Sequence, residues 1–282
     1  YPNLQIILVD NGPTEEGHQN LKDNLPSDER LVLCRLKDNK GYVGGVNHAL
    51  KKGMELGTDY FIILNNDTVI HHGAITALLN GCIKYNDKVI VSGKVYHYHK
   101  INELQFVGYK WKNENLLDPT PIGVNEIDNG QYDKEEFRDM LDDIFWLFSE
   151  KIIKDIGFYS QYFWFNTEQR DFAMRAKKAG YQLLYTPKAK IWHKGSVSVG
   201  GRDGNPAYDY WYTQSSLIFS YLHLSKINFF YYYWKQRLSL ARSHTKVFLS
   251  GKEKSTNLKC IQAKYAAFKY FSKWKKNKMS NS

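Results

Sequence analysis

The chain has 282 residues and a mass of 33.0 kDa, which is enough for one large or two ordinary domains of about 150 residues each. Its hydrophobic content of 43% and charged content of 24% are ordinary for a globular chain, so wholesale disorder is excluded. Cys34, Cys82 and Cys260 are far apart and form no C-x-x-C, so neither a disulfide framework nor a thiolate zinc site is indicated, and a reducing compartment fits best. The longest strongly apolar run, residues 227–234, is much shorter than the ~18–20 residues that cross a bilayer.

The net charge of +10 is unevenly distributed along the chain. Residues 223–282 contain 14 Lys and Arg and the single acid Glu253, whereas residues 1–222 contain 25 basic and 28 acidic residues. The local charges are therefore +13 and −3. We expect any anionic surface to be met by the C-terminal segment rather than by the body of the protein.

The N-terminal part alternates short apolar runs with helical patterns, which predicts right-handed βαβ units and a parallel sheet. We expect this half-domain to extend over residues 1–95. The strands are predicted at 4–9, 31–34 and 60–64, and the helices at 15–24 and 46–56.

The pattern becomes less regular in the middle of the chain. Eight acids and two bases without an apolar period lie at 126–143, and they predict an exposed loop or short helices. An aromatic helical region begins at Tyr208. Between them we predict a strand at 144–148, a helix that ends at Gly157, a helix at 170–178 and a strand at 182–185.

Two segments of the N-terminal half are candidates for binding a nucleotide. Asp10-Asn11-Gly12 follows the first strand, where ligands bind in open α/β sheets, although the same residues also form simple turns. The segment 39–47 is a glycine-rich turn before a helix, where backbone N–H groups favour anions. A tight structural turn explains the second segment equally well.

Polar residues after three later elements are candidates for catalysis and metal binding. Asp67, in Asn65-Asn66-Asp67-Thr68, offers a hard oxygen ligand for Mg²⁺ or Mn²⁺, or the segment is an Asx-turn. Glu168 and Asp171 share one helix face and could supply a base, or they could simply favour the helix dipole. His193 is either a structural histidine or a ligand.

Taken in this order, the motifs resemble those of inverting glycosyltransferase family 2, in particular its bacterial rhamnosyltransferase-like branch. The similarity extends from Tyr1 to about Gly201. Segment 9–12 resembles the V-D-N-G-S turn, and Gly41, Gly44, Gly45 and Asn47 match N-x-G-[FY]-x-G-G-x-N. Segment 64–68 is similar to the family's degenerate D-x-D motif. Residues 157–176 resemble its G-F-D-E…E-D-x-D-x-x-x-R block, and Trp192-His193 resembles a W-H pair that occurs late in the family's sequences.

The resemblance implies a GT-A fold, an α/β architecture with a Rossmann-like, mostly parallel central sheet and helices on both faces. It implies a catalytic domain over 1–205, with a nucleotide-sugar half at 1–95 and an acceptor half at 96–205, and then an aromatic, basic helical region at 206–282. The implied donor contacts are Asp10, Asn11, Gly41, Gly44, Gly45, Asn47, Asn66 and Asp67; the implied metal ligands are Asp67 and His193; and the implied bases are Glu168 and Asp171.

The chain departs from the family pattern at two places. Gln169 stands where the family usually has Asp, and an amide cannot accept a proton at neutral pH, so Glu168 or Asp171 would have to act as the base. Pro13 also replaces the usual Ser. The family's first strand and helix have no counterpart before Tyr1, so we expect an open neighbour position in the sheet and an incomplete wall for the base.

The implied reaction is a single displacement that moves a sugar from a dTDP-, UDP- or GDP-linked donor to a hydroxyl of a cell-surface glycan or lipid-linked acceptor. The lysine-flanked apolar period of residues 258–274 suggests attachment to an anionic membrane surface, which would place the protein on the cytoplasmic face of a bacterial plasma membrane. An ordinary helix packed on the body of the protein has the same period. A catalytically silent scaffold that binds sugar nucleotide or glycan also fits the motifs, whereas a nucleic-acid-binding protein is less favoured because no nucleic-acid motif is present.

Overall fold

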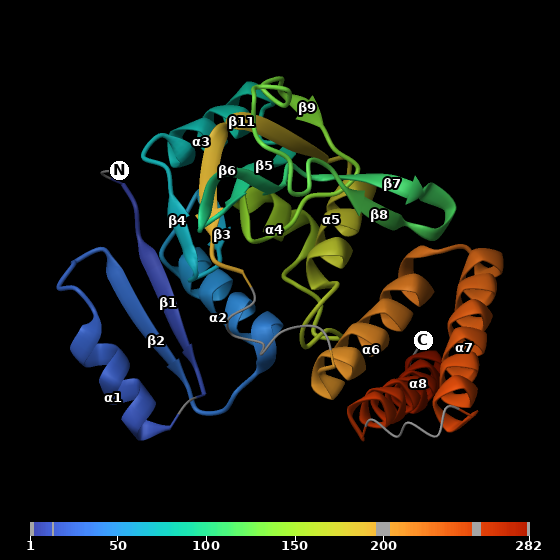
Figure 1. Ribbon diagram of the computed structural model, residues 1–282. Helices are drawn as coiled ribbons and strands as arrows, with labels where there is room; N and C mark the ends of the chain where they lie inside the picture. Colours follow the sequence, from blue (N-terminus) through green and yellow to red (C-terminus); the bar gives the residue numbers. More distant parts are fainter. Residues whose placement is uncertain (1–2, 13, 196–203, 250–254, 281–282) are drawn as a thin grey trace.

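The computed structural model describes residues 3–12, 14–195, 204–249 and 255–280, so Pro13, Gly201 and Glu253 lie outside the described residues. The N-terminal unit consists of two parallel strands and two helices (Figure 1). The side chain of Thr14 accepts a hydrogen bond from the Gly17 N–H and begins the first helix. This strand–helix–strand unit agrees with the expected pattern. Its elements are β1 (Ile6–Asn11), α1 (Glu15–Asn24), β2 (Leu31–Leu36) and α2 (Gly41–Glu55).

The central sheet has seven strands and is mixed. Strands β5 and β11 are parallel, whereas β10 is antiparallel to both β3 and β5, and β11 is antiparallel to β4. The predicted α/β class is confirmed, but this sheet contains more antiparallel pairs than expected because β10 inserts between β3 and β5. The strands are β3 (Tyr60–Leu64), β10 (Phe145–Ser149), β5 (Val89–His97), β11 (Gln182–His193) and β4 (Thr68–Ile70), with β6 (Lys100–Phe106) beside β5 and β9 (Glu136–Phe137) beside β11.

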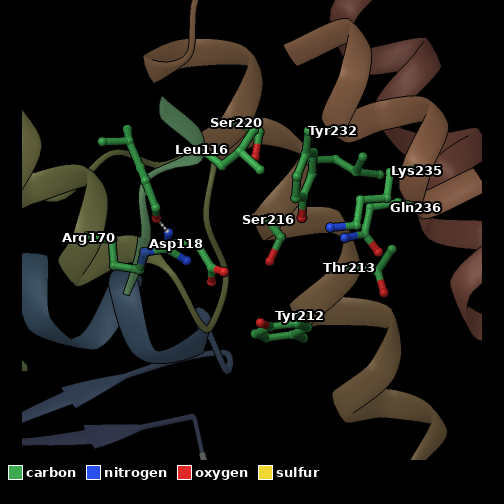
Figure 2. Close-up of a pocket in the computed structure, with 12 residues that line it drawn as sticks. Leu116, Asp118, Arg170, Tyr212, Thr213, Ser216, Ser220, Tyr232, Lys235 and Gln236 are labelled. Atoms are coloured by element: carbon green, nitrogen blue, oxygen red, sulfur yellow. Dashed lines mark hydrogen bonds between the residues drawn. The ribbon is translucent and has the colours of Figure 1, made fainter. Parts of the chain in front are cut away.

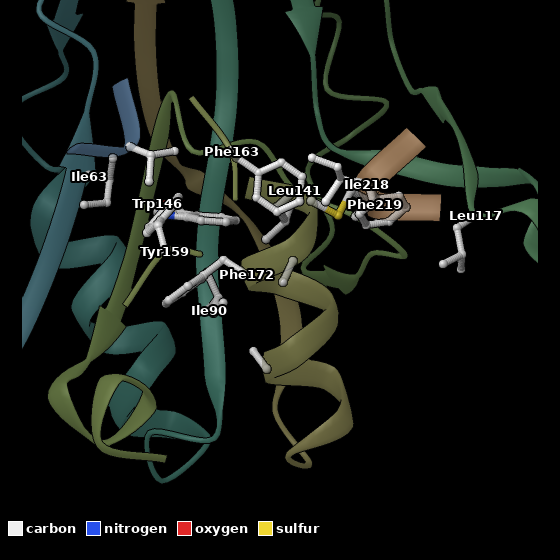
Figure 3. Packing of buried hydrophobic residues seen from close by; sticks show 14 of the residues in the cluster. Ile63, Ile90, Leu117, Leu141, Trp146, Tyr159, Phe163, Phe172, Ile218 and Phe219 are labelled. Carbon is white, nitrogen blue, oxygen red and sulfur yellow. The ribbon is translucent and has the colours of Figure 1, made fainter. Parts of the chain in front are cut away.

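The two faces of this sheet are covered by different helices. Strand β10 shows the division, because Phe145 and Leu147 belong to one buried cluster while Trp146 and Phe148 belong to the other, as the period of two in a strand requires. The first cluster lies under α3 (Ala74–Lys84). The second includes Phe172 of α5 (Glu168–Lys178) (Figure 3) and extends beside α4 (Glu150–Ile156).

Strands β1 and β3 are not paired with each other, and a cavity of about 540 Å³ lies between them. Ile7 of β1, Leu50 of α2, and Phe61 and Ile63 of β3 are among the side chains that line it. Within the described part of the chain, no strand pairs with β1 on the side opposite β2.

A hairpin that the sequence analysis did not predict extends from the sheet towards the C-terminal helices (Figure 1). It consists of β7 (Tyr109–Asn113), the 3-10 helix η1 (Glu114–Leu116) and β8 (Asp118–Pro121). Leu117 joins η1 to β8 in a left-handed conformation. The sequence pattern does not indicate β8 as a strand because it contains two prolines, and proline is tolerated only in edge strands such as this one.

The C-terminal region is an assembly of three helices, α6 (Pro206–His223), α7 (Lys226–Leu249) and α8 (Ser255–Ser280), which lie together on the side away from β1 and β2 (Figure 1). The apolar period predicted at 258–274 faces the protein: Ile261, Phe268 and Phe271 of α8 are buried. The expectation that this face meets a membrane is therefore wrong, because α6 covers it. None of the helices in the described ranges has the length and apolarity to cross a bilayer.

The acidic segment 126–143 is only partly exposed, which corrects the prediction of an exposed loop or short helices. It is mostly irregular and contains β9, but Met140, Leu141 and Asp143 are buried. The Lys94 ammonium of β5, 1% exposed, anchors the segment because its Nζ lies 2.6 Å from both Asp128 and Asp133 carboxylates. A buried ion pair of this kind is costly to break on one side only.

We therefore expect Lys94→Met to lower the free energy of unfolding by about 3 kcal/mol, because Asp128 would lose its partner in a nearly buried position. The control is Lys84→Met, whose partner Glu135 lies in the same segment but forms a more exposed pair, and whose loss should cost less than ~1 kcal/mol. Urea unfolding of both variants measures the difference. Equal destabilisation by the two substitutions would contradict the anchoring role.

Candidate active site

The two predicted metal ligands lie side by side at one edge of the sheet. Asp67 is in the turn between β3 and β4, and His193 is the last residue of β11, where the antiparallel register places it opposite Thr68. The Asp67 Oδ1 is therefore 3.1 Å from the His193 Nε2. This contact joins residues that are 126 positions apart in the sequence.

A neighbouring amide sets the orientation of the His193 ring. Gln105 of β6 donates from Nε2 to the His193 carbonyl at 2.8 Å, and its Oε1 lies 2.9 Å from His193 Nδ1. Because that oxygen can only accept, we assign the ring proton to Nδ1 and a lone pair to Nε2. This is the arrangement that a metal-binding histidine requires.

The pair fits a divalent cation that takes further ligands from a substrate. A carboxylate oxygen and an imidazole nitrogen suit Mn²⁺ or Mg²⁺. In the part of the chain that the structure describes, no group of three or more His, Cys, Asp or Glu is arranged as a metal site. Asp67 and His193 would thus supply two ligands and leave positions for phosphate oxygens and water.

The glycine-rich segment is the start of a helix rather than a turn before one. Helix α2 begins at Gly41, five residues earlier than predicted. Gly41 has φ of +70°, and a Cβ there would lie 2.6 Å from the Trp164 ring, so both its conformation and its surroundings require glycine. A Cβ at Gly44 would lie 2.3 Å from the Lys40 Cβ, and one at Gly45 would lie 3.4 Å from the Asn11 side chain.

Asn11 joins the end of β1 to this helix start. Its Nδ2 donates to the Gly41 carbonyl at 2.8 Å, and its Oδ1 accepts from the Lys40 N–H at 2.9 Å. Asp10 precedes it and pairs with His18 of α1, with 2.6 Å between Oδ2 and Nδ1. Both predicted donor contacts therefore lie where β1 ends, and both side chains have partners within the protein.

Asn47 and Asn66 have different surroundings. Asn47 is buried, and both ends of its amide bond to the main chain of Tyr159, with Nδ2 at 2.8 Å from O and Oδ1 at 3.0 Å from N. This corrects the expectation that Asn47 contacts the donor, because its amide holds the segment before α5 against α2. Asn66 is exposed in the turn beside Asp67, and its contact with the donor stays a prediction.

Glu168 lies in a group of buried carboxylates at the start of α5. It is 3% exposed, and its Oε2 has no hydrogen-bond partner. Burial, followed by the negative charge of Asp143, raises the pKa of Glu168 well above its usual value. Among the described residues, Glu168 is therefore not held in an ion pair.

Asp142 and Asp143 complete this group and were missed as site residues. Burial and the charge of Asp142 raise the pKa of Asp143 to about 7, although the hydroxyls of Tyr42 and Tyr159 donate to it, each at 3.0 Å. Burial also raises the pKa of Asp142. Their position directly before the apolar strand at 144–148 could have indicated them as site residues. The acidic composition of the whole segment 126–143 made them look like ordinary exposed acids.

Asp171, the second predicted base, already has partners for both carboxylate oxygens. Its Oδ1 is 2.8 Å from His223 Nε2 and its Oδ2 is 2.8 Å from Arg175 Nε. Burial alone would raise the pKa of Asp171, but the hydrogen bonds and charges of His223 and Arg175 hold it below its usual value. Asp171 thus positions α5 against α6, and the geometry favours Glu168 as the base.

Comparison with known families identifies the fold around this site. The family model described as Glycosyl transferase family 2 matches residues 1–154, which is more than half of the chain. The chain belongs to glycosyl transferase family 2. In this glycosyltransferase the matched region includes Asp67, Asp142 and Asp143, whereas Glu168 and His193 lie beyond it.

A solved structure of GalNAc-T7 with UDP, GalNAc and Mn²⁺ has a fold similar to that of this glycosyltransferase. The TM-score is 0.57 at 11% sequence identity, and the similarity covers 75% of this chain and 41% of that chain. The glycosyltransferase thus spans less than half the length of that structure, and the likeness supports the predicted GT-A architecture. No curated protein matches the sequence.

The buried carboxylates make the stability of this glycosyltransferase depend on pH. The folded-state pKa of Asp143, about 7, exceeds the ordinary value of 3.8, so the wild type loses stability as the pH rises from ~4 to ~7. We expect Asp143→Asn to remove this contribution, so that its stability relative to wild type increases by about 2–4 kcal/mol between pH 5 and pH 8. Urea unfolding at the two pH values measures this, and an unchanged difference would contradict the assignment.

Proposed function

We propose that the chain is an inverting, metal-assisted glycosyltransferase that moves a sugar from a nucleoside diphosphate to a hydroxyl of a glycan or lipid-linked acceptor. Family membership supports glycosyl transfer, and the contact between Asp67 and His193 is the observation that carries the metal-dependent donor site. The motifs that resemble the rhamnosyltransferase branch make rhamnose the first donor sugar to test. dTDP-, UDP- and GDP-linked donors are the candidates for the nucleotide.

In this proposal, Asp67 and His193 hold Mg²⁺ or Mn²⁺ beside the donor diphosphate. A divalent cation supplies positive charge that stabilises the negative charge developing on the leaving diphosphate. The N-terminus of α2 also favours an anionic group, although its Gly41 N–H already donates to Asn39 Oδ1 at 2.8 Å, and Asn66 offers an amide beside Asp67. Gly44 and Gly45 remain proposed contacts of the donor. The side chains at the donor edge therefore bind and orient the diphosphate.

Glu168 is the proposed general base. The acceptor oxygen forms a bond to the anomeric carbon, its proton passes to the Glu168 carboxylate, and the nucleoside diphosphate leaves from the opposite face with the electrons of the broken C–O bond. Configuration at that carbon is inverted. Proton removal of this kind contributes ~10²–10⁴-fold to the rate when the base is ionised and within reach of the acceptor hydroxyl.

The exposed apolar side chains of the C-terminal region that support membrane attachment lie on α7 rather than on the inward face of α8. Ile227, Phe230, Tyr231, Trp234 and Leu238 follow helical spacing and are exposed, Ile227 by 81% and Phe230 by 65%. Lys226, Lys235, Arg237, Arg242 and Lys246 lie on the same helix, which has no acidic residue. An apolar stripe flanked by cations fits an anionic lipid surface, so we propose peripheral attachment at the cytoplasmic face of the plasma membrane through α7.

The donor site is tested by release of nucleoside diphosphate from dTDP-, UDP- and GDP-sugars with and without Mn²⁺. We expect Asp67→Ala and His193→Gln to abolish metal-dependent release, and Glu168→Gln to reduce transfer by at least ~10²-fold while donor binding is kept. His97→Gln, which changes an imidazole on the neighbouring strand β5, is the control. Metal-dependent release that survives Asp67→Ala would remove that residue from the site, and donor binding without turnover in the wild type would identify a silent scaffold.

The role of α7 is tested by sedimentation with vesicles of phosphatidylcholine and of phosphatidylcholine with phosphatidylglycerol. We expect binding only to the anionic vesicles, and a loss of ~tenfold or more with Ile227→Ser and Phe230→Ser combined, because each side chain would lose apolar burial in the lipid. Ile101→Ser, at an exposed position on β6, is the matched control. Binding to oligonucleotides without binding to lipid would overturn the membrane role.

A further inference from the structure

A polar, partly open cavity of about 170 Å³ lies between the β7–β8 hairpin, the start of α5 and the C-terminal helices (Figure 2). Helix α5 contributes Arg170, and β8 contributes Asp118. Helix α6 adds hydroxyls and an aromatic ring, and α7 adds a cation, a phenol and an amide. These side chains are Tyr212, Thr213, Ser216 and Ser220 of α6, and Tyr232, Lys235 and Gln236 of α7.

Arg170 is held in place but is not neutralised. One of its terminal nitrogens donates to the Leu117 carbonyl, and the guanidinium lies 4.4 Å from the centre of the Phe219 ring. Its Nε is buried without a hydrogen-bond partner, and among the described residues no carboxylate lies within ion-pair distance of it. A buried donor left unsatisfied is costly, and an immobilised guanidinium suits a carboxylate or phosphate.

The remaining groups agree with an anionic ligand that also carries hydroxyls. Lys235 adds a second cation, while the only acid that lines the cavity among the described residues, Asp118, is exposed. Burial raises the pKa of Tyr232 to about 12, so its phenol stays neutral and can donate. The hydroxyls and the amide of Gln236 offer the hydrogen bonds that sugar hydroxyls need.

The size and position of the cavity restrict what binds there. Pockets that enclose a drug-sized ligand measure ~300–1,000 Å³, so about 170 Å³ holds one charged group with part of a sugar ring. Arg170 is two residues from Glu168 in the first turn of α5. A group bound in the cavity would therefore lie beside the helix that carries the proposed base, on the side of the C-terminal helices.

We propose that this cavity binds an anionic group, a carboxylate or a phosphate, carried by the acceptor saccharide. The proposal rests on the proposed function, because it names the acceptor class of the same transferase. Arg170 and Lys235 attract the charge, and the hydroxyl and amide groups of α6 and α7 contact the attached sugar. The bound part of the acceptor is then held against α5, the helix that also carries Glu168.

The test titrates the full chain with glucuronate, glucose 6-phosphate, glucose and inorganic phosphate, with calorimetry or NMR as the readout and without donor. We expect at least one of the two anionic sugars to bind about tenfold or more tightly than glucose and than inorganic phosphate, which corresponds to ~1.4 kcal/mol. Stronger binding of glucuronate identifies a carboxylate ligand, and stronger binding of glucose 6-phosphate identifies a phosphate. Equal affinity for charged and neutral sugars, or inorganic phosphate binding as tightly as the anionic sugars, would overturn the proposal.

Variants locate the binding. Lys235 is exposed on α7, so Lys235→Gln should fold normally and weaken binding of the preferred anionic sugar about tenfold, whereas Lys226→Gln, the same change at the start of α7, should have no effect. Arg170→Lys keeps the positive charge but loses the planar pair of N–H donors of the guanidinium, so it should also weaken binding. Unchanged affinity in Lys235→Gln would refute the cavity as the site. Metal-dependent release of nucleoside diphosphate is measured separately. Its absence in the wild type would reject the proposed function, whereas binding of the anionic sugars tests the cavity independently.

Discussion

The antiparallel register between β4 and β11 is the constraint on which the candidate site depends. Three residue pairs hold the short strand β4 to the end of β11, and the turn that presents Asp67 precedes β4 directly. A shift of one residue would move every side chain of β4 to the opposite face and would separate the Asp67 carboxylate from the His193 imidazole. The neighbouring strands β5 and β11 help to fix that register, because their apolar side chains are fully buried against α3. These side chains are Val91 and Val95 of β5 and Leu184 and Ile191 of β11.

Several buried carboxylates lie near the same end of the sheet. They fall into two groups, those paired with a cationic side chain and those without one. Asp171 is neutralised by Arg175 and His223 and acts as a structural bond between α5 and α6. Asp143 and Glu168 have no cationic partner in the described residues and have raised pKa values. Folding therefore tolerates an electrostatically unfavourable arrangement, and this arrangement is consistent with the proposed proton transfer to Glu168.

Much of the fold and part of the site could be predicted from the sequence. Strands β1 to β3 and helix α1 follow from local patterns, because strand ends and their polar exits are visible in a short window. The closeness of Asp67 and His193 does not follow from such a window, because 126 positions separate them, and only the family resemblance implied it. The mixed order of the central sheet, the hairpin β7–β8 and the inward face of α8 could not be predicted. These features depend on which distant segment covers which face: the lysine-flanked period of α8 is the same whether α6 or a membrane lies against Ile261 and Phe268. Composition was also misleading at Asp142 and Asp143, since the exposed acids around them masked one half-buried and one buried carboxylate.

Helix α5 connects the separate parts of this molecule. Its first turn carries Glu168, the unusual Gln169 and Arg170, and its next residue, Asp171, bonds to the C-terminal end of α6. The C-terminal helices are thus fixed to the helix that carries the proposed base, so the exposed stripe of α7 and the cavity beside Arg170 keep a set distance from the donor edge. The proposed transfer would benefit from such a rigid link, because a reacting hydroxyl displaced by about 1 Å can lose ~10²-fold in rate. Edge-on and tilted ring contacts among Tyr221, Phe229, Phe271 and Trp274 join α6, α7 and α8, and they account for the aromatic composition of the C-terminal region.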